Sequence, residues 1–412
     1  MNVETSFAAK ATAPEVDSRY SWIRLGVAIL LSTIGGVGLW SVVVALPAVQ
    51  AEFGVARADA SLPFTLTTIG FAFGGIFMGR LADRFGVVVP LICGAVFLAS
   101  GFVISSYAAT LWQFALAQGL LIGFGSSVTF GPMMADISHW FVRRRGIAVA
   151  ICAAGNYFAG AIWPPIVQHF IASEGWRATQ AGIGIFCVVT MIPLAFTLRG
   201  RAAPMEKAVS HSFAGAREDL GVPPNVLQAL LIVAAVACCV AMAMPQVHIV
   251  AYCGDLGYGV ARGAEMLSAM LLFGIVSRIG SGFIADRIGG LRTLLLGSVL
   301  QGVALALFLG FDGLVSLYVI SALFGLFQGG IVPSYAIIVR EYFSPREAGT
   351  RVGVVLMASL FGMALGGWMS GLIFDLTGSY HAAFINGLLW NFLNVAIVLW
   401  LLTRPSQRIV TA

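Results

Sequence analysis

An eight-residue segment occurs twice in this chain, once in each half of the sequence. Residues 79–86 read Gly-Arg-Leu-Ala-Asp-Arg-Phe-Gly, and residues 282–289 read Gly-Phe-Ile-Ala-Asp-Arg-Ile-Gly. A second pair precedes them, because Gly-Val-Ala-Arg occupies both 54–57 and 259–262. Each octapeptide ends one long apolar segment and begins another. Repeats that stay in register in this way indicate a duplicated fold whose two halves share one topology.

Long apolar segments fill most of the 412 residues. The chain is 59% hydrophobic and 10% charged, with a mean hydropathy of +0.93, which is too little charge for a soluble protein of this length. A helix needs about 20 apolar residues to cross about 30 Å of hydrocarbon. We therefore expect an all-α integral membrane protein with twelve transmembrane helices in two six-helix bundles, at residues 23–198 and 224–403. The predicted spans are 24–47, 60–80, 87–107, 111–139, 146–170, 178–198, 225–252, 264–284, 291–310, 314–339, 348–374 and 381–402.

Lysine and arginine are distributed unevenly between the two sides of the predicted membrane. Of the 23 basic residues, 19 lie on the side of both termini, three lie in loops on the other side, and one, Arg278, lies within a span. Basic segments stay in the cytoplasm, so we expect the N-terminal tail 1–22, the linker 199–223 and the tail 404–412 to be cytoplasmic. The net charge of +5 then reflects topology and does not indicate nucleic-acid binding. The expected location is a cell membrane, and specifically a bacterial inner membrane.

The sequence lacks catalytic and metal-binding patterns. It has no Gly-x-x-x-x-Gly-Lys loop for nucleotide phosphates and no His-Glu-x-x-His pair for zinc. The six cysteines lie mostly inside apolar spans and lack metal-ligand spacing. We therefore expect no enzyme activity, no cofactor and no metal site, and transport driven by nucleotide hydrolysis is excluded.

The repeated octapeptide resembles the signature loop of the major facilitator superfamily, Gly-x-Leu-Ala-Asp-Arg-x-Gly-Arg-[Arg/Lys]. The first copy departs from it at Val87, where a basic residue is usual. The resemblance implies two bundles that rock about a central cavity. It also implies a conformational switch on the cytoplasmic side, in which carboxylates cap or pair with a neighbouring helix; a simple turn that sets topology is the alternative. The switch residues would be Asp83, Arg84, Asp286 and Arg287.

A narrower resemblance appears around span five. Residues 140–150 read Trp-Phe-Val-Arg-Arg-Arg-Gly-Ile-Ala-Val-Ala, and Ala-Ala-Gly-Asn follows at 153–156. This is similar to the aromatic, basic and small-residue pattern of the monocarboxylate transporter family and its bacterial oxalate–formate exchanger relatives. Ordinary close packing of helices also explains the small residues. The resemblance implies a secondary active transporter that moves a small organic monocarboxylate across the membrane by alternating access, and we expect it to be a monomer.

Arg278 is the main candidate for substrate binding. It lies eight residues before Asp286, about 12 Å along a helix and therefore within the membrane. The repeat aligns it with Gly75, so the duplication does not explain it. A charge at this depth costs about 2.5–3.5 kcal/mol or more, which suggests a function. The alternative is a structural arginine that pairs with backbone carbonyls or with an acid in the membrane, although no acidic residue lies at mid-depth in any predicted span. The monocarboxylate family has an arginine in span eight at this spacing, taken to meet the substrate carboxylate, often with an aspartate four residues earlier, where this chain has Gly274.

Five further residues are candidates for lining a central cavity. Asn156, Tyr157 and Gln328 are polar groups at mid-span that need partners, and Trp40 offers an aromatic surface. His248 is expected either to bind a ligand or proton, or to be a hydrogen-bonded core residue.

The coupling ion stays open at this point. Lysine occurs only in the predicted N-terminal tail and linker, so the lysine that animal monocarboxylate carriers have in span one for proton coupling is missing. One buried cation suits one carboxylate better than two, and both proton symport and anion exchange remain compatible with it. Asp136, near the inner end of span four, is expected to pair with a cytoplasmic cation such as Arg80 or Arg84 rather than to carry protons.

Export of amphipathic or drug-like compounds, with Arg278 in a structural role, is the main alternative. A cavity lined almost wholly by apolar groups would favour it. Proton-driven drug exporters have an Arg-x-x-Gln-Gly pattern in span four, and here Ala115 replaces the arginine before Gln118 and Gly119, which argues against that branch. A membrane sensor would need a soluble output segment, and the linker 199–223 leaves little room for one.

Overall fold

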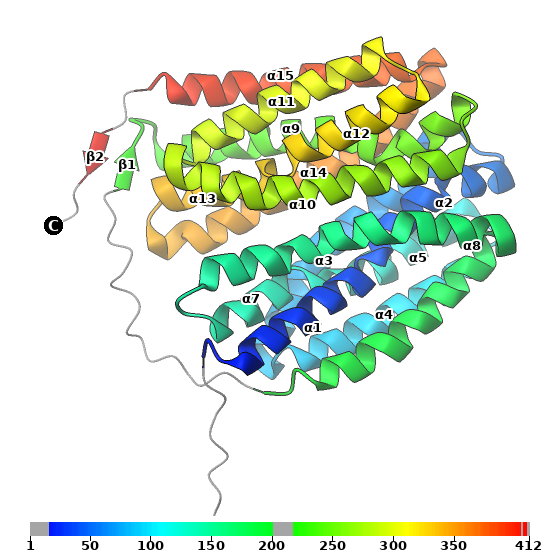
Figure 1. Cartoon of the computed structure of the whole chain (residues 1–412), viewed down its shortest axis with the longest axis horizontal. Helices are drawn as coiled ribbons and strands as arrows, with labels where there is room; N and C mark the ends of the chain where they lie inside the picture. The colour runs from blue at the N-terminus through cyan, green and yellow to red at the C-terminus, as the bar shows by residue number, and fades with distance from the viewer. Residues whose placement is uncertain (1–15, 201–216, 405–406, 410–412) are drawn as a thin grey trace, which may run out of the picture.

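A computed structural model describes residues 16–200, 217–404 and 407–409. These residues form a bundle of long helices that lie side by side (Figure 1). Eleven helices in the described part of the chain are long and apolar enough to cross a membrane. The longest, α8 (Arg145–Phe196), breaks at Gly175, whose φ of 81° and ψ of 160° are not helical. This break divides α8 into two spans, which gives the predicted twelve, although the predicted connecting loop is reduced to one residue.

The helices form two groups, with α1–α8 below and α9–α15 above in Figure 1. Between the groups, α10 packs against α8 and α14 packs against α3. The first half contains, in order, α1 (Arg19–Gly35), α2 (Val37–Phe53), α3 (Arg57–Phe85), α4 (Val88–Ser106), α5 (Leu111–Ala117), a π-helix (Gln118–Gly123), α6 (Phe124–Ser126), a 3-10 turn (Ser127–Thr129), α7 (Gly131–Trp140) and α8. The second half contains α9 (Pro224–Asp255), α10 (Val260–Ile288), α11 (Gly290–Gly310), α12 (Leu314–Gln328), α13 (Ile331–Tyr342), α14 (Pro345–Thr377) and α15 (Tyr380–Leu402).

The repeated octapeptides close α3 and α10, which have 29 residues each. Their final glycines, Gly86 and Gly289, have φ values of 82° and 83°. Residues with a side chain rarely adopt this backbone conformation, whereas glycine adopts it without strain. The same tight reversal in both halves therefore explains why both copies end in glycine. The end of the bundle that holds these turns is called the Asp83 end below, and the opposite end, where α3 begins and α14 finishes, is called the Arg57 end.

Glycines also allow helices to touch within each half. A Cβ atom on Gly70 would lie 1.9 Å from the carbonyl oxygen of Gly119, and one on Gly325 would lie 1.9 Å from that of Met270. Neither position has room for a side chain. These contacts bring α3 against span four, and α10 against α12, at backbone distance, as in other helix pairs built from small residues.

Two short strands lie outside the helices, and neither was predicted. β1 (Arg217–Asp219) pairs antiparallel with β2 (Gln407–Ile409). The pairing joins the predicted linker 199–223 to the predicted tail 404–412. At the other end of the chain α1 begins at Arg19, inside the predicted tail 1–22, and residues 1–15 lie outside the described part of the chain.

Candidate substrate site

Arg278 lies on α10 at the boundary between the two halves. Its Nη1 donates a hydrogen bond to the carbonyl oxygen of Ala153 at 3.1 Å, and its Nε donates to that of Gly329 at 3.4 Å. Its guanidinium carbon lies 4.2 Å from the ring centroid of Tyr157. The side chain is partly exposed, and no carboxylate in the described residues forms an ion pair with it. Carbonyl dipoles and an aromatic face therefore hold the cation, as the structural alternative for Arg278 expects, and no described carboxylate neutralises its charge.

Tyr157 on α8 links Arg278 to Gln328. The tyrosine is buried, and its hydroxyl donates to Oε1 of Gln328 at 3.4 Å. Gln328 at the end of α12 is fully buried, and its Nε2 has no hydrogen-bond partner among the described atoms. A buried donor without a partner costs about 1–3 kcal/mol. The site thus has an unused amide donor close to its cation.

The missing side chain at Gly274 makes room for Tyr157. A Cβ atom on Gly274 would lie 2.4 Å from Cε1 of the tyrosine ring. The ring therefore fills the place in which many members of the resembled family have an aspartate side chain. As a result, Arg278 has an aromatic ring beside it instead of an acid one helical turn away.

Trp40 and Asn156 extend this group within the first half. The indole N–H of Trp40 donates to the backbone carbonyl of Asn156 at 3.2 Å. Asn156 is half-buried, and its Oδ1 lies 3.4 Å from the place of a Cβ atom on Gly36. The structure thus joins Arg278, Tyr157 and Gln328 through side-chain contacts. Trp40 is joined to them only through the backbone carbonyl of Asn156, and the Asn156 amide faces Gly36.

His248 lies apart from that group. It is fully buried on α9, and its Nε2 lies 2.7 Å from the carbonyl oxygen of Gly367 while its Nδ1 lies 3.1 Å from the hydroxyl of Tyr380. These partners belong to α14 and α15. Of the two expectations for His248, the hydrogen-bonded core residue matches its surroundings, and contact with the Arg278 group has no support in the described contacts.

Arg57 organises a network that joins the two halves at the Arg57 end. Its guanidinium donates to the hydroxyl of Tyr380 at 2.7 Å and to Asp255 at 3.2 Å. The backbone N–H groups of Arg57 and Ala58 donate to the Asp375 carboxylate at 2.8 and 2.7 Å. Asp375 in the second half thus caps the N-terminus of α3 in the first, where the helix dipole favours an anion. We call Arg57, Asp255, Asp375, Tyr380 and His248 the Arg57 network.

The four predicted switch residues have a different environment. All four are exposed, and none forms an ion pair with another described residue: Asp83, Arg84, Asp286 and Arg287.

The junction of α3 with α14 continues from the Arg57 end into the bundle, where the rings of Phe73 and Phe361 lie 6.1 Å apart. The described polar and ring contacts between the halves therefore lie between the Arg57 end and the depth of Arg278, and they include the hydrogen bonds from Thr65 to Ala364 and from Ser268 to Ala161.

Asp136 pairs with Arg24 and not with Arg80 or Arg84. Its two carboxylate oxygens accept hydrogen bonds from Nε and Nη2 of Arg24, both at 2.8 Å. Arg24 is 2% exposed, and Trp140 covers its guanidinium at 4.5 Å. The expected ion-pair role of Asp136 holds, but its partner comes from α1. Burial selects Arg24, because Arg80 and Arg84 at the end of α3 point to solvent.

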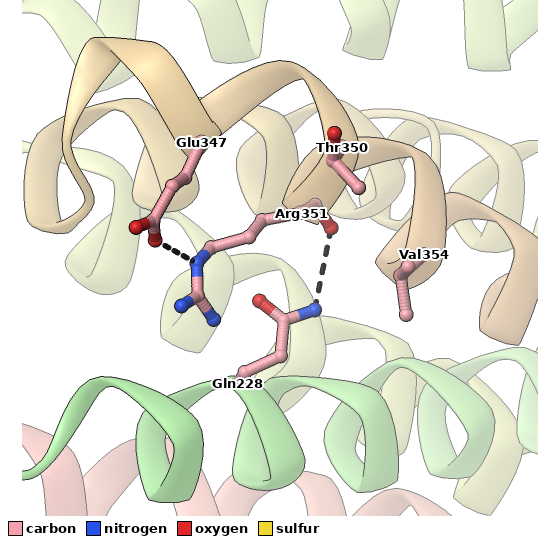
Figure 2. A pocket seen from close by; sticks show the side chains of 5 residues that line it. All are labelled: Gln228, Glu347, Thr350, Arg351 and Val354. Carbon is pink, nitrogen blue, oxygen red and sulfur yellow. Dashed lines mark hydrogen bonds and ion pairs between the residues drawn. The ribbon is translucent and has the colours of Figure 1, made fainter.

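A cavity of about 390 Å³ opens elsewhere, between the first turns of α9 and α14. Arg351 is the one cation among the described residues that line it, and Figure 2 shows that Glu347 points toward it. The two side chains form an ion pair at 2.8 Å. The Gln228 amide donates to the backbone carbonyl of Arg351 at 3.3 Å. None of the predicted binding residues lines this cavity. Because its cation is already neutralised, the cavity is a weaker candidate for an anion than Arg278.

The sequence profile of the Major Facilitator Superfamily matches residues 28–314 and 266–411. This chain belongs to the Major Facilitator Superfamily. A solved bacterial homologue of the human lysosomal transporter Spinster has the same fold, with a TM-score of 0.72 at 16% identity over 93% of this chain and 95% of its own. Monocarboxylate transporter 13 of Rattus norvegicus is 27% identical over 78% of this chain and 75% of its own. An MFS-type transporter of Gibberella moniliformis is 25% identical over 84% and 86%. This facilitator is therefore a membrane transporter and not an enzyme, and it resembles the monocarboxylate transporters.

Sequence reasoning missed the Arg57 network of this facilitator. The predicted spans 24–47 and 60–80 leave Arg57 in the loop between them, although it is the first residue of α3 and is 8% exposed. The repeated Gly-Val-Ala-Arg segment was one signal, since it marks the same turn in both halves. Its second copy ends in Arg262, which is exposed and pairs with Glu265 on its own helix at 3.0 Å. The repeat alone could not show which of the two arginines joins the halves.

Proposed function

We propose that this facilitator is a secondary active transporter of a small organic monocarboxylate, which it carries by alternating access, and that Arg278 binds the carboxylate. The observation that supports this proposal most is the position of the cation. Arg278 is partly exposed at the boundary between the halves, it touches a carbonyl from each half, and no described carboxylate neutralises it. Relatives named monocarboxylate transporters are consistent with this substrate class.

Binding at this position would link the substrate to movement. A carboxylate that leaves water loses its hydration, and the guanidinium offsets that loss with two parallel, charge-assisted hydrogen bonds. The Nε2 of Gln328 offers one further donor. Because Arg278 and Tyr157 belong to different halves, a ligand between them contacts both bundles. Such a ligand favours a conformation in which both bundles approach it, which is the requirement for a population shift on binding.

We also propose an orientation, with the Asp83 end in the cytoplasm. The basic residues support it, since the sequence predicts 19 of 23 on that side. The Arg57 network then closes the external end, and the exposed switch residues correspond to a cytoplasmic latch that is open. We further propose that the protein resides in a cell membrane and acts as a monomer. Proton symport and anion exchange both fit one cation that binds one carboxylate.

Counterflow uptake in proteoliposomes tests the proposed substrate class. Liposomes loaded with an unlabelled monocarboxylate should take up the labelled acid, and loading with the corresponding amide or a dicarboxylate should give little uptake. Export of amphipathic compounds is the alternative, supported by the apolar character of the spans. That alternative would be favoured if the uptake rate increases with the apolar surface area of the compound and is the same for an acid and its amide.

The switch assignment gives a separate prediction. Asp83→Asn and Asp286→Asn should each slow transport, because a neutral amide forms a weaker cap or pair with a neighbouring helix when the cytoplasmic end closes. Equilibrium binding of the acid should stay within a few-fold of the wild type. Asp286 lies eight residues after Arg278 on α10, about 12 Å along the helix, and Asp83 occupies the corresponding turn at the end of α3. Initial rates in proteoliposomes and binding to purified protein separate the two effects. A loss of binding as large as that of an Arg278 variant would place these carboxylates in the substrate site instead.

A further inference from the structure

The hydrogen bonds of His248 define one protonation state. A carbonyl oxygen only accepts, so the contact of 2.7 Å with Gly367 requires a proton on Nε2. The other nitrogen, Nδ1, faces the hydroxyl of Tyr380 at 3.1 Å. In a neutral imidazole with its proton on Nε2, Nδ1 is an acceptor, and Tyr380 donates its hydroxyl proton to it.

The second contact of Tyr380 completes this arrangement. Its oxygen accepts a hydrogen bond from Nη1 of Arg57 at 2.7 Å. The chain of donors therefore runs from Arg57 to Tyr380 to His248 to the carbonyl of Gly367. Arg57 donates at one end of the chain and the carbonyl of Gly367 accepts at the other, while Tyr380 and His248 each donate once and accept once. The chain passes from the first half of the molecule into the second.

A second proton on His248 would break this chain. Nδ1 would then donate toward an oxygen that already accepts from Arg57, and the hydroxyl proton of Tyr380 would lose its acceptor. The imidazolium would also bring a second positive charge next to the Arg57 guanidinium in a site without solvent access. The remaining charged and titratable groups around His248 are Tyr252, Asp255 and Asp375. Both carboxylates are engaged already, Asp255 with the Arg57 side chain and Asp375 with the first N–H groups of α3.

We propose that His248 is a proton-binding site that controls the Arg57 network, with the network closed only when His248 is neutral and opened when an external proton binds. This inference rests on the orientation and the alternating-access cycle proposed above, and it is independent of the substrate. The proton binds to the open form and leaves before closure, so His248 does not carry it across the membrane. External acid therefore holds the external end open.

The expected size of the effect follows from linkage. A histidine exposed to water has a pKa of about 6.5, so lowering the external pH from 7.5 to 5.5 should favour the open form by about tenfold. External acid should therefore slow the cycle by holding the external end open. In simple proton symport the effect is the opposite, because external acid accelerates inward transport.

A cysteine at Ser61 reports the opening without any substrate. Ser61 is fully buried on α3, and its Oγ lies 2.9 Å from the place of a Cβ atom on Gly371 of α14. In cells that produce full-length Ser61→Cys protein, the labelling rate with a membrane-impermeant maleimide is measured at both pH values. The exposed loop variant Ala109→Cys provides the reference rate, which corrects for the reactivity of thiols at each pH.

The corrected rate should rise about tenfold at pH 5.5, from the linkage argument above. In His248→Gln it should stay flat, because the amide of glutamine can donate to Gly367 and accept from Tyr380 without titrating. His248→Asn serves the same purpose if the glutamine variant does not fold. His381→Gln is the matched control, because His381 is exposed beside Tyr380 and its replacement should leave the pH response intact.

A wild-type labelling rate that does not change with pH, or an equal rise in the variants that lack His248, would overturn the proposal. Failure of Arg278 to bind a carboxylate would leave this result unaffected.

Discussion

Arg278→Ala is expected to weaken the binding of a monocarboxylate by about 30- to 4000-fold. Removing one partner of a desolvated, hydrogen-bonded charge pair costs about 2–5 kcal/mol, and each 1.4 kcal/mol corresponds to about tenfold in affinity. The effect should be large because no other described cation contacts the Tyr157 and Gln328 group. The measurement is calorimetric affinity of purified protein for the acid that passes the counterflow assay.

Two variants separate charge from geometry and from general damage. Arg278→Lys should bind more tightly than the alanine variant and less tightly than the wild type, because an ammonium keeps the charge and loses the planar, two-pronged fit to a carboxylate. Arg262→Ala is the matched control on the same helix, since Arg262 is exposed and its one ion pair among the described residues is with Glu265. It should stay within about twofold, as expected for a surface pair. If Arg278→Ala binds the acid with wild-type affinity, Arg278 has a structural role, and export of amphipathic compounds becomes the favoured function.

Gly274→Ala is expected to weaken binding by roughly 5- to 150-fold. The new methyl group would lie 2.4 Å from Cε1 of Tyr157, so the buried ring must move, and overpacking of this kind costs about 1–3 kcal/mol. The range applies if the whole cost falls on the bound state. A displaced ring would no longer hold the guanidinium at its present 4.2 Å.

Gly280→Ala is the control for this substitution. It lies on the same helix, and a Cβ atom there would meet no atom within 4 Å. Alanine at this position should leave binding unchanged and should raise stability slightly, since alanine favours helix over glycine. Binding and thermal stability should be measured together for both variants. If Gly274→Ala binds like the wild type, the Tyr157 ring does not support the Arg278 site.

The fold could be predicted from the sequence because its main signals are local. Span length, charge asymmetry and a repeated turn each depend on neighbouring residues, and the closing glycines of α3 and α10 need positive φ wherever the rest of the chain lies. The single-residue break at Gly175 was harder to see. The predicted loop around it contains Glu174 and Arg177, and these charges do not show that the helix resumes at once.

The site could be predicted only in part, for a related reason. Arg278 was identified by its depth, which follows from its distance along one helix. Its contact with Tyr157 depends on how α8 packs on α10, and the space left by Gly274 becomes visible only in that packing. The partners suggested for Asp136, Arg80 and Arg84, were wrong. The sequence gives the side of the membrane on which a residue lies, but it does not give the helix that packs beside it. The Arg57 network joins residues more than 300 positions apart, such as Arg57 and Asp375, and no local pattern connects them.

The most direct test compares one monocarboxylate with its primary amide on purified wild-type protein. The two compounds have nearly the same shape and differ in charge, so the ratio of their dissociation constants isolates the interaction between Arg278 and the carboxylate. A charge pair at this site predicts an acid that binds at least about 30-fold more tightly than the amide. An amide that binds as tightly as the acid would contradict carboxylate recognition by Arg278.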